Sequence, residues 1–416
     1  MIEFKAGALH IEGRSAKEIA ERYGTPCYVY SRNEIKTNYE KFDHAFGDRK
    51  KLICYAVKAN STLAIIKLLA DLGSGFDIVS GGELKRVIAA GGDPNKIVFS
   101  GVGKTELEIL EAIQTGIKCF NIESESELKR IAETARKLEK LARVSFRVNP
   151  DVDAKTHPYI STGLKENKFG VDIEDALKLY KLASENPFVT PTGIDCHIGS
   201  QLTEISPIRD AAQKVVELTD QLAKSGIEIE HVDFGGGLGI KYDKESICSH
   251  EQLIVTLIDV MGDRPQEVLI EPGRSIVGTA GVLLTSIEYI KPGRHKNFAV
   301  VDAAMNDLAR PSLYDAFHRI ENIQESDESS RNENLYDVVG PICETGDFLG
   351  KDRILSILEG DILAVHSVGA YGMTMSSNYN TRGRAAEVLI DKDQMHLIRK
   401  RETFKDLISL ENLINT

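Results

Sequence analysis

The most constraining feature of the sequence is a pattern that recurs eight times between residues 53 and 270. A short apolar segment is followed by a turn, and an amphipathic stretch then precedes most of the next segments. The apolar segments are 53–57, 76–79, 97–99, 119–122, 144–148, 193–197, 231–234 and 268–270. Apolar strands that alternate with helices are typical of a parallel sheet covered by helices. Eight such units predict an α/β fold with a closed (β/α)8, TIM-like barrel.

The stretches between these segments carry apolar residues at helical spacing. They are 61–72, 83–90, 105–115, 125–141, 173–185, 207–225 and 250–261, and 33–46 is a candidate for the remaining helix. An open doubly wound sheet is the alternative arrangement of such units. Its usual fingerprint, G-x-G-x-x-G opening a helix after the first strand, is absent from the sequence.

After about Gly278 the pattern changes to short strands separated by turns. The predicted strands are 282–290, 298–301, 335–339, 361–365 and 386–390, and residues 1–30 also carry strand signals. We therefore expect a barrel domain over residues 31–275 and a mainly β domain made of residues 1–30 and 276–416. The acidic segment 324–334 lacks periodicity and is interpreted as a solvated loop whose role the sequence does not assign.

Charge and cysteine content exclude several classes of protein. The chain has 51 basic and 63 acidic residues, a net charge of −12, which argues against binding to nucleic acids or anionic membranes. Its six cysteines are far apart and form no C-x-x-C, so neither a zinc site nor a disulfide scaffold is expected, and no metal is predicted. Free thiols, an N-terminus unlike a signal peptide and the lack of a long apolar run predict a cytoplasmic protein.

The active residues of a barrel of this kind lie at the carboxyl ends of its strands. At these positions the sequence has Lys58, His197, a triple glycine at 235–237, and Glu271 followed by Arg274. Taken singly, each has an ordinary explanation, such as a solvated lysine, a buried core histidine or a tight turn. Together they predict one rim that carries an amine, an imidazole, a phosphate-type loop and a carboxylate.

This combination indicates a cofactor. The glycines after the seventh strand and Gly273 after the eighth match the usual phosphate position of a barrel. A lysine at the same rim becomes a nucleophilic amine when it is desolvated, and it can form a Schiff base. Phosphate and Schiff-base lysine together suggest pyridoxal 5'-phosphate, with Glu271 keeping the pyridine nitrogen protonated and His197 stacked on the ring.

Nine segments in chain order carry a resemblance to a known family. They are Y-A-V-K-A-N at 55–60, F-D-I-V-S-G-G-E at 76–83, H-I-G-S-Q at 197–201, D-F-G-G-G-L-G at 233–239, E-P-G-R at 271–274, M-N-D-L-A-R-P-S-L-Y-D-A-F-H at 305–318, G-P-I-C-E-T-G-D at 340–347, G-A-Y-G at 369–372 and N-Y-N-T-R-G-R at 378–384. The chain resembles the fold-type III pyridoxal phosphate-dependent decarboxylases, whose barrel is alanine racemase-like. The likeness covers almost the whole sequence.

The resemblance implies roles for individual residues. The catalytic residues would be Lys58 as the Schiff-base lysine, Cys343 as the proton donor, His197 and Glu271. The cofactor would be bound by Lys58, His197, Ser200, Gly236, Gly237, Glu271, Pro272, Gly273, Arg274 and Tyr371, and the substrate by Arg274, Arg310, Tyr314, Glu344 and Tyr371. Arg274, Arg310 and Tyr314 would hold the distal carboxylate of the substrate, and Glu344 its distal ammonium group. Cys343 and Glu344 would come from the neighbouring subunit of a homodimer with shared sites.

The implied reaction is decarboxylation of meso-2,6-diaminopimelate to L-lysine and carbon dioxide, the last step of bacterial lysine biosynthesis. Ornithine, arginine and carboxynorspermidine are alternative substrates within the family. A pyridoxal-fold regulator without turnover is a further alternative, but Lys58 and Cys343 are both retained. An amino-acid racemase is disfavoured because we would expect an arginine in place of Glu271.

Overall fold

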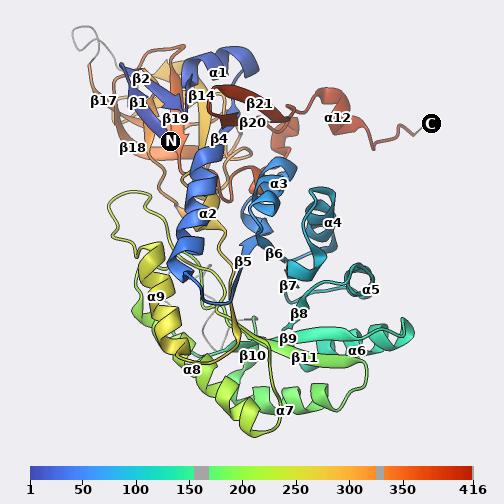
Figure 1. The fold of residues 1–416 in the computed structure, drawn as a ribbon. Helices are drawn as coiled ribbons and strands as arrows, with labels where there is room; N and C mark the ends of the chain where they lie inside the picture. Colours follow the sequence, from blue (N-terminus) through green and yellow to red (C-terminus); the bar gives the residue numbers. More distant parts are fainter. Residues whose placement is uncertain (154–167, 325–331, 415–416) are drawn as a thin grey trace. The chain divides into compact units, whose positions relative to one another are not determined.

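Eight parallel strands close into a barrel in the computed structural model, which describes residues 1–153, 168–324 and 332–414 (Figure 1). The strands are β5 (Lys51–Ala56), β6 (Gly75–Ile78), β7 (Ile97–Phe99), β8 (Cys119–Ile122), β9 (Ala142–Asn149), β11 (Val189–Asp195), β12 (His231–Asp233) and β13 (Glu267–Ile270). Pairing of β8 with β9 and of β13 with β5 completes the circle, and the short β10 (Val171–Asp172) is attached to β9. The predicted (β/α)8 barrel is confirmed, and each predicted barrel strand overlaps an observed one.

Helices alternate with these strands and surround the barrel. They are α2 (Arg32–Phe46), α3 (Leu63–Asp71), α4 (Gly81–Ala89), α5 (Glu106–Thr115), α6 (Glu125–Lys137), α7 (Ile173–Ser184), α8 (Ser206–Lys224), α9 (His250–Met261) and the short α10 (Arg274–Val277). Local sequence determines where several of them begin. Thr105 starts α5 and Ser249 starts α9 with capping boxes, in which the hydroxyl accepts from the third backbone N–H of the helix.

The inside of the barrel contains both apolar side chains and a buried histidine. Buried side chains from four of the strands form an apolar cluster of Leu52, Cys54, Val98, Cys119 and Leu269. His231 is also fully buried, and burial lowers its pKa to about 3, so its ring is neutral at physiological pH. The ring occupies the space beside Gly193 of the neighbouring strand β11, where a Cβ atom would come 2.0 Å from Nε2 of His231.

The remaining sequence forms mainly strands, as predicted. They are β1 (Ile2–Lys5), β2 (Ala8–Ile11), β3 (Arg14–Ser15), β4 (Cys27–Ser31), β14 (Gly281–Lys291), β15 (Asn297–Val301), β16 (Ile320–Asn322), β17 (Asn334–Val339), β18 (Phe348–Leu355), β19 (Ile362–His366), β20 (Ala386–Asp391) and β21 (Gln394–Arg399), with helices α1 (Ala16–Tyr23), α11 (Arg310–Tyr314) and α12 (Phe404–Ile408). Strand β4 lies between β14 and β20, so the N-terminal segment completes the sheet of the C-terminal part.

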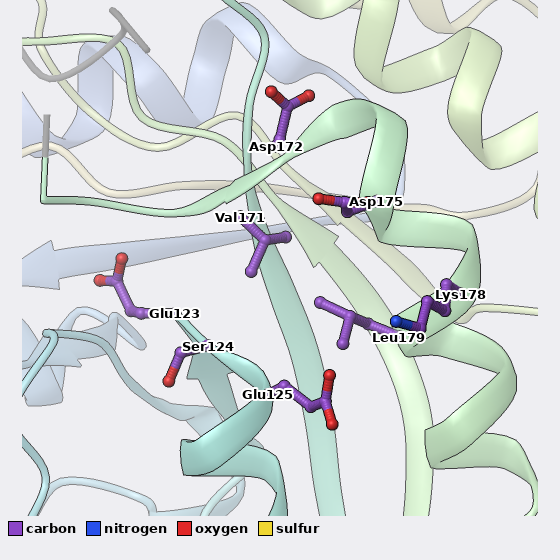
Figure 2. A pocket seen from close by; sticks show the side chains of 8 residues that line it. All are labelled: Glu123, Ser124, Glu125, Val171, Asp172, Asp175, Lys178 and Leu179. Atoms are coloured by element: carbon purple, nitrogen blue, oxygen red, sulfur yellow. The ribbon is translucent and has the colours of Figure 1, made fainter. Parts of the chain in front are cut away.

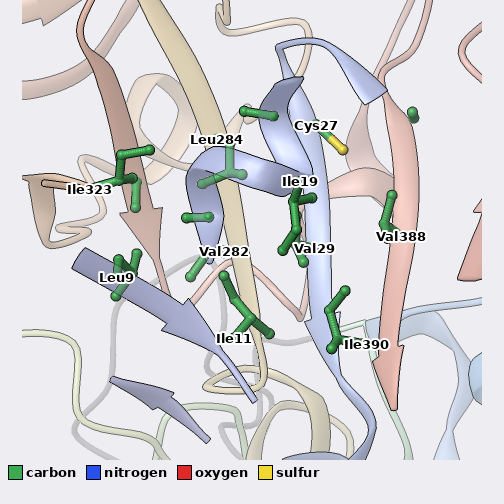
Figure 3. Packing of buried hydrophobic residues seen from close by; sticks show 14 residues of the cluster. Leu9, Ile11, Ile19, Cys27, Val29, Val282, Leu284, Ile323, Val388 and Ile390 are labelled. Carbon is green, nitrogen blue, oxygen red and sulfur yellow. The ribbon is translucent and has the colours of Figure 1, made fainter. Parts of the chain in front are cut away.

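Buried aliphatic side chains from both ends of the chain form the core of this mainly β part. Figure 3 shows Ile19 of α1 and Val29 of β4 packed with Val282 of β14 and Val388 of β20. Because these residues alternate with others along their strands, one face of the sheet is turned toward the helix α1. The N-terminal strand signals therefore belong to the same core as the C-terminal ones.

The chain divides into two compact units. We call Asn38–Lys241 with Glu245–Ile276 the barrel unit, and Met1–Thr37, Tyr242–Lys244 and Val277–Thr416 the β unit. The functional division that we expect, residues 31–275 against the flanking segments, stays a prediction. Residues 325–331 of the predicted acidic loop lie outside the described residues. Among the residues that are described, no helix is long and apolar enough to cross a bilayer.

The contact between Gly193 and His231 gives a test of barrel packing. We expect Gly193→Ala to destabilise the protein by about 1–3 kcal/mol, because the added methyl group overlaps a ring enclosed by the barrel. The urea midpoint of the circular dichroism signal measures the change. Gly103→Ala is the control, since its Cβ would meet no atom within 4 Å, and it should change stability by less than about 0.5 kcal/mol. Equal midpoints for the two variants would contradict the predicted packing.

Candidate active site

Lys58 follows the first barrel strand directly, in a turn of 3₁₀ helix at Val57–Ala59. Its Nζ atom lies 2.6 Å from Oδ2 of Asp77, which ends β6 and has no exposed area. The lysine side chain is 37% exposed, so it is not desolvated in the way the sequence alone suggested. A carboxylate at this distance fixes the direction of the amine. Asp77 therefore positions the nitrogen at the rim of the barrel.

Glu271 follows the last barrel strand and is buried. Its Oε1 atom accepts hydrogen bonds from Nδ2 of Asn121, at 3.4 Å, and from the hydroxyl of Ser100, at 3.5 Å. The Asn121 amide also donates to Oγ of Ser100, at 3.1 Å. Neither Ser100 nor Asn121 was predicted from the sequence. Both hold the Glu271 carboxylate in one orientation.

The spacing along the strands explains why these three residues meet. Ser100, Asn121 and Glu271 each lie two residues beyond a member of the apolar cluster, namely Val98, Cys119 and Leu269. Because side chains two residues apart in a strand share a face, all three point into the barrel one level nearer its carboxyl end. A polar residue two positions after an inward apolar residue is the sequence signal that would have placed Ser100 and Asn121 on the inner face, although it would not have revealed Glu271 as their partner.

Two more acids, Asp195 and Asp233, lie beside Glu271. Carboxylate oxygens of the three residues lie within 4.8 Å of one another, and all three side chains are buried. In the part of the chain that the structure describes, Oδ1 of Asp195 and Oδ2 of Asp233 have no hydrogen-bond partner. Burial, followed by the neighbouring Asp77, Asp233 and Asp195, raises the pKa of Glu271 well above its usual value. Such a cluster favours a cationic, proton-bearing group facing Glu271.

His197 lies after β11, where both its ring and its backbone carbonyl oxygen accept hydrogen bonds. Its Nδ1 atom accepts a hydrogen bond from the backbone N–H of Gly236, at 3.2 Å. Burial, then Arg147 and Lys58, lower the pKa of His197 well below its usual value. The imidazole is therefore neutral, with its proton on Nε2. Arg147 also donates to the carbonyl oxygen of His197, at 3.3 Å, and is paired with Glu123.

The glycines at 235–237 are required by close backbone contacts. A Cβ atom at Gly236 would come 2.1 Å from the carbonyl oxygen of Glu271, and one at Gly237 would come 2.4 Å from that of Gly199. Gly237 also has a φ angle of +109°, which only glycine adopts readily. Beside this turn, Nη2 of Arg274 donates to the hydroxyl of Ser200, at 3.2 Å. A hydroxyl and a guanidinium next to a glycine turn suit a phosphate group.

Pro272 and Gly273 connect this turn to the lysine segment. The carbonyl oxygen of Pro272 accepts from the backbone N–H of Ala56, at 3.1 Å. A Cβ atom at Gly273 would come 2.9 Å from Cβ of Ala59, so the segment before and after Lys58 packs directly on Gly273. The rim residues predicted from four different loops, those after β5, β11, β12 and β13, are thus neighbours in the barrel unit.

The other predicted residues belong to the β unit. Arg310 and Tyr314 lie on α11, and Arg310 is buried while Tyr314 is partly exposed. Cys343 and Glu344 are exposed in a turn, where the N–H of Cys343 donates to Oδ1 of Asn380, at 3.3 Å, and Glu344 accepts from the hydroxyl of Tyr379. The hydroxyl of Ser312 donates to the carbonyl oxygen of Gly346, at 2.6 Å, and so ties α11 to this turn.

Tyr371 is in the β unit as well, in the segment G-A-Y-G. It has a φ angle of +57°, which is uncommon for a tyrosine. A Cβ atom at the preceding Gly369 would come 1.8 Å from the carbonyl oxygen of Val277, and one at Gly372 would come 2.5 Å from that of Val368. The glycines let the chain pass close to other backbone, and this path determines where Tyr371 projects.

A pocket of ≈ 290 Å³ lies in the barrel unit but includes none of the predicted site residues (Figure 2). Its lining comes from the end of β8 and from β10 with α7, and consists of Glu123, Ser124, Glu125, Val171, Asp172, Asp175, Lys178 and Leu179. The lining holds four carboxylates and a single lysine. Glu123 is the link to the rim, because it also pairs with Arg147 at 3.2 Å.

Comparisons with known proteins agree with one another. The family model described as pyridoxal-dependent decarboxylase, pyridoxal binding domain, matches residues 32–278. The chain is 53% identical to a diaminopimelate decarboxylase of Pseudomonas aeruginosa over 411 residues, covering 99% of this chain and 98% of the relative. It is similar to the structure of a diaminopimelate decarboxylase from Methanocaldococcus jannaschii in complex with L-lysine, with a TM-score of 0.94, 44% identity and coverage of 100% of this chain and 98% of that chain.

A lysine decarboxylase structure from Selenomonas ruminantium is also similar, but less so. Its TM-score is 0.82 at 25% identity, covering 93% of this chain and 98% of that chain. The fold is thus shared more widely than the sequence. In sequence, this chain is less similar to that lysine decarboxylase than to the Pseudomonas and Methanocaldococcus diaminopimelate decarboxylases.

The bond from Asn121 to Glu271 gives a test of the barrel site. We expect Asn121→Ala to lower kcat about 10-fold with little change in KM, because a hydrogen bond to a buried charged group contributes about 1.5–3 kcal/mol. Steady-state carbon dioxide release measures both constants. Asn186→Ala is the control, since Asn186 bonds to the N–H of Phe188 just before β11, at the opposite end of the barrel. The prediction fails if both variants retain full kcat.

Proposed function

Because the chain belongs to the pyridoxal-dependent decarboxylase family, we propose that it converts meso-2,6-diaminopimelate to L-lysine and carbon dioxide. The observation that carries this conclusion is identity above one half to a diaminopimelate decarboxylase along almost the whole chain. The protein is accordingly a carboxy-lyase, and its reaction is the last step of bacterial lysine biosynthesis. It uses pyridoxal 5'-phosphate.

The rim of the barrel fits this cofactor. When bound, pyridoxal phosphate supplies an aldehyde for covalent attachment and a ring that accepts electrons from the α-carbon of the substrate. Gly236 and Gly237, with Ser200 and Arg274, suit its phosphate, because the turn excludes side chains and the neighbouring groups donate hydrogen bonds. The buried acids around Glu271 suit a protonated ring nitrogen, because their mutual repulsion and burial favour a positive charge beside them.

The other rim residues act on the amine and on the ring. Lys58 provides the nitrogen that attaches the cofactor, and Asp77 holds this nitrogen in place. His197 offers a neutral, flat ring whose Nδ1 atom is held by the backbone N–H of Gly236, while Arg147 holds its backbone carbonyl oxygen. Ser100 and Asn121 hold Glu271 so that its carboxylate keeps a proton at the facing atom.

The residues of the β unit would bind the far end of the substrate and protonate its α-carbon. In this proposal Arg310 and Tyr314, with Arg274 of the barrel unit, bind the distal carboxylate, and Glu344 binds the distal ammonium group. Tyr371 contributes to the binding of both the cofactor and the substrate. Cys343 gives a proton to the α-carbon, and its exposed position within a single chain supports a role in a site completed by another chain.

Substrate choice follows from these charges. Ornithine and arginine lack a second carboxylate, so their binding would leave buried cationic groups such as Arg274 and Arg310 without the anion that they are proposed to bind. The missing carboxylate makes the alternative substrates within the family unfavourable. Greater similarity to the diaminopimelate enzymes than to the lysine decarboxylase supports the same choice.

A substrate panel tests the proposed reaction. We expect kcat/KM for meso-2,6-diaminopimelate to exceed that for ornithine, arginine or carboxynorspermidine by roughly 100-fold or more, because unpaired buried charges cost several kcal/mol. Carbon dioxide release is measured for each compound at matched concentrations. Lys58→Ala is the control and should release none. Efficient turnover of ornithine without turnover of diaminopimelate would overturn the assignment.

We also propose a homodimer with shared sites and a cytoplasmic location. The exposure of Cys343 and Glu344 supports the first, and six free cysteines support the second, since thiols persist in reducing compartments. A shared site would take Lys58 from one chain and Cys343 from its partner.

Mixing two inactive variants tests the shared site. Lys58→Ala and Cys343→Ala are each expected to lose most activity, but a mixed dimer would contain one intact site. After full exchange of subunits, about a quarter of the parent activity should return. Native mass spectrometry verifies the exchange, and Lys58→Ala mixed with a mass-tagged Lys58→Ala is the control. Exchange without recovery would exclude a site divided in this way.

A further inference from the structure

His318 is buried in the β unit, has no exposed area and lies beside Arg310. It ends the motif that begins at Met305, and the sequence assigned it no role. Its Nε2 atom lies 2.9 Å from Nη1 of Arg310, and its Nδ1 atom lies 2.8 Å from the carbonyl oxygen of His366. The imidazole therefore connects the guanidinium of α11 with the last residue of β19.

The two partners determine where the proton of the ring lies. A carbonyl oxygen can only accept a hydrogen bond, and a guanidinium can only donate one. Nδ1 of His318 must therefore carry the hydrogen and donate it to His366, while Nε2 offers its lone pair to Arg310. A second proton on the ring would point an N–H group of a cation at another cation. The observed arrangement selects the neutral ring in one tautomer.

The sheet makes this arrangement rigid. The N–H of His366 donates to the carbonyl oxygen of Arg319, at 2.8 Å, and β19 pairs with both β16 and β14. The carbonyl oxygen that receives the bond from His318 is thus fixed by the strands around it. The sheet therefore sets the direction of Nε2, and the hydrogen bond at Nε2 in turn orients the guanidinium of Arg310.

Tyr242 holds the same guanidinium from another side. Cζ of Arg310 lies 4.7 Å from the centre of the Tyr242 ring, and this ring meets the ring of His318 edge to face at 5.3 Å. An aromatic face attracts the guanidinium, and its plane limits the orientations that the guanidinium adopts. Two contacts of different kinds therefore determine the pose of Arg310.

We propose that His318 is a positioning residue, which orients Arg310 to bind the distal carboxylate of the substrate. This inference rests on the proposed function, specifically on the role of Arg310. A guanidinium has five N–H groups, so one bond to His318 is compatible with a two-bond contact to a carboxylate. His318 does not touch the α-carbon chemistry, and its loss should weaken binding of the carboxylate-bearing end alone.

Two isosteric variants separate the two bonds of the ring. His318→Gln can place an acceptor where Nε2 lies, whereas His318→Asn reaches only the position of Nδ1 and leaves Arg310 without its acceptor. We expect H318N to raise KM for meso-2,6-diaminopimelate about 10-fold or more, with kcat within about threefold of the parent. H318Q should recover most of the loss. Circular dichroism and thermal melting confirm that each variant is folded.

Two inhibitors show which end of the substrate is affected. L-lysine retains the distal carboxylate, whereas 1,5-diaminopentane has the same chain without it. H318N should weaken inhibition by L-lysine as strongly as it raises KM, and inhibition by 1,5-diaminopentane should stay unchanged. A merely structural role would weaken both inhibitors, and this outcome would overturn the proposal.

A double-mutant comparison separates this inference from the proposed function. If His318 acts through Arg310, H318N should have little further effect on KM when it is combined with Arg310→Ala. If R310A raises KM and H318N alone leaves it unchanged, the positioning role is refuted while the role of Arg310 stands. If R310A leaves KM unchanged, the proposed carboxylate site itself is refuted, and the positioning role is refuted with it.

Discussion

The burial of Glu271 among other carboxylates is the constraint on which the barrel site depends. Burial is the largest cause that raises the pKa of Glu271, and the neighbouring Asp77, Asp233 and Asp195 raise it further. Such an environment favours a positively charged, proton-donating group beside Glu271. The barrel tolerates these acids because they occupy only the level above the apolar cluster. The apolar level supplies packing, and the polar level supplies chemistry.

In the β unit, too, the residue proposed to contact the substrate is oriented by other residues. Arg310 is buried, and its orientation comes from His318 and Tyr242. His318 is itself held by the backbone of β19. A long, flexible side chain would otherwise lose considerable rotamer entropy when it binds a carboxylate. In the proposed role of Arg310, fixing the guanidinium in advance reduces that loss.

Much of the fold and of the rim could be predicted from the sequence because both depend on local rules. Each of the eight barrel strands was predicted, because apolar runs bounded by turns can be recognised from the sequence without knowledge of tertiary contacts. Lys58, His197 and Glu271 were identified because a barrel places the ends of its strands at one rim. Ser100 and Asn121 were missed because an ordinary serine and asparagine gain their role only from a partner 171 and 150 residues away in the chain, respectively.

By itself, the sequence determined the alternation of strands and helices, the glycine turn and the set of candidate side chains at the strand ends, because spacing and residue type are local properties. Only the tertiary structure decided which of those side chains meet and in which protonation state. The closure of the barrel brings Ser100 and Asn121 to Glu271, and the pairing of β19 gives His318 the carbonyl oxygen that fixes its tautomer. Both results depend on distances between atoms far apart in the chain, and no local pattern encodes such distances.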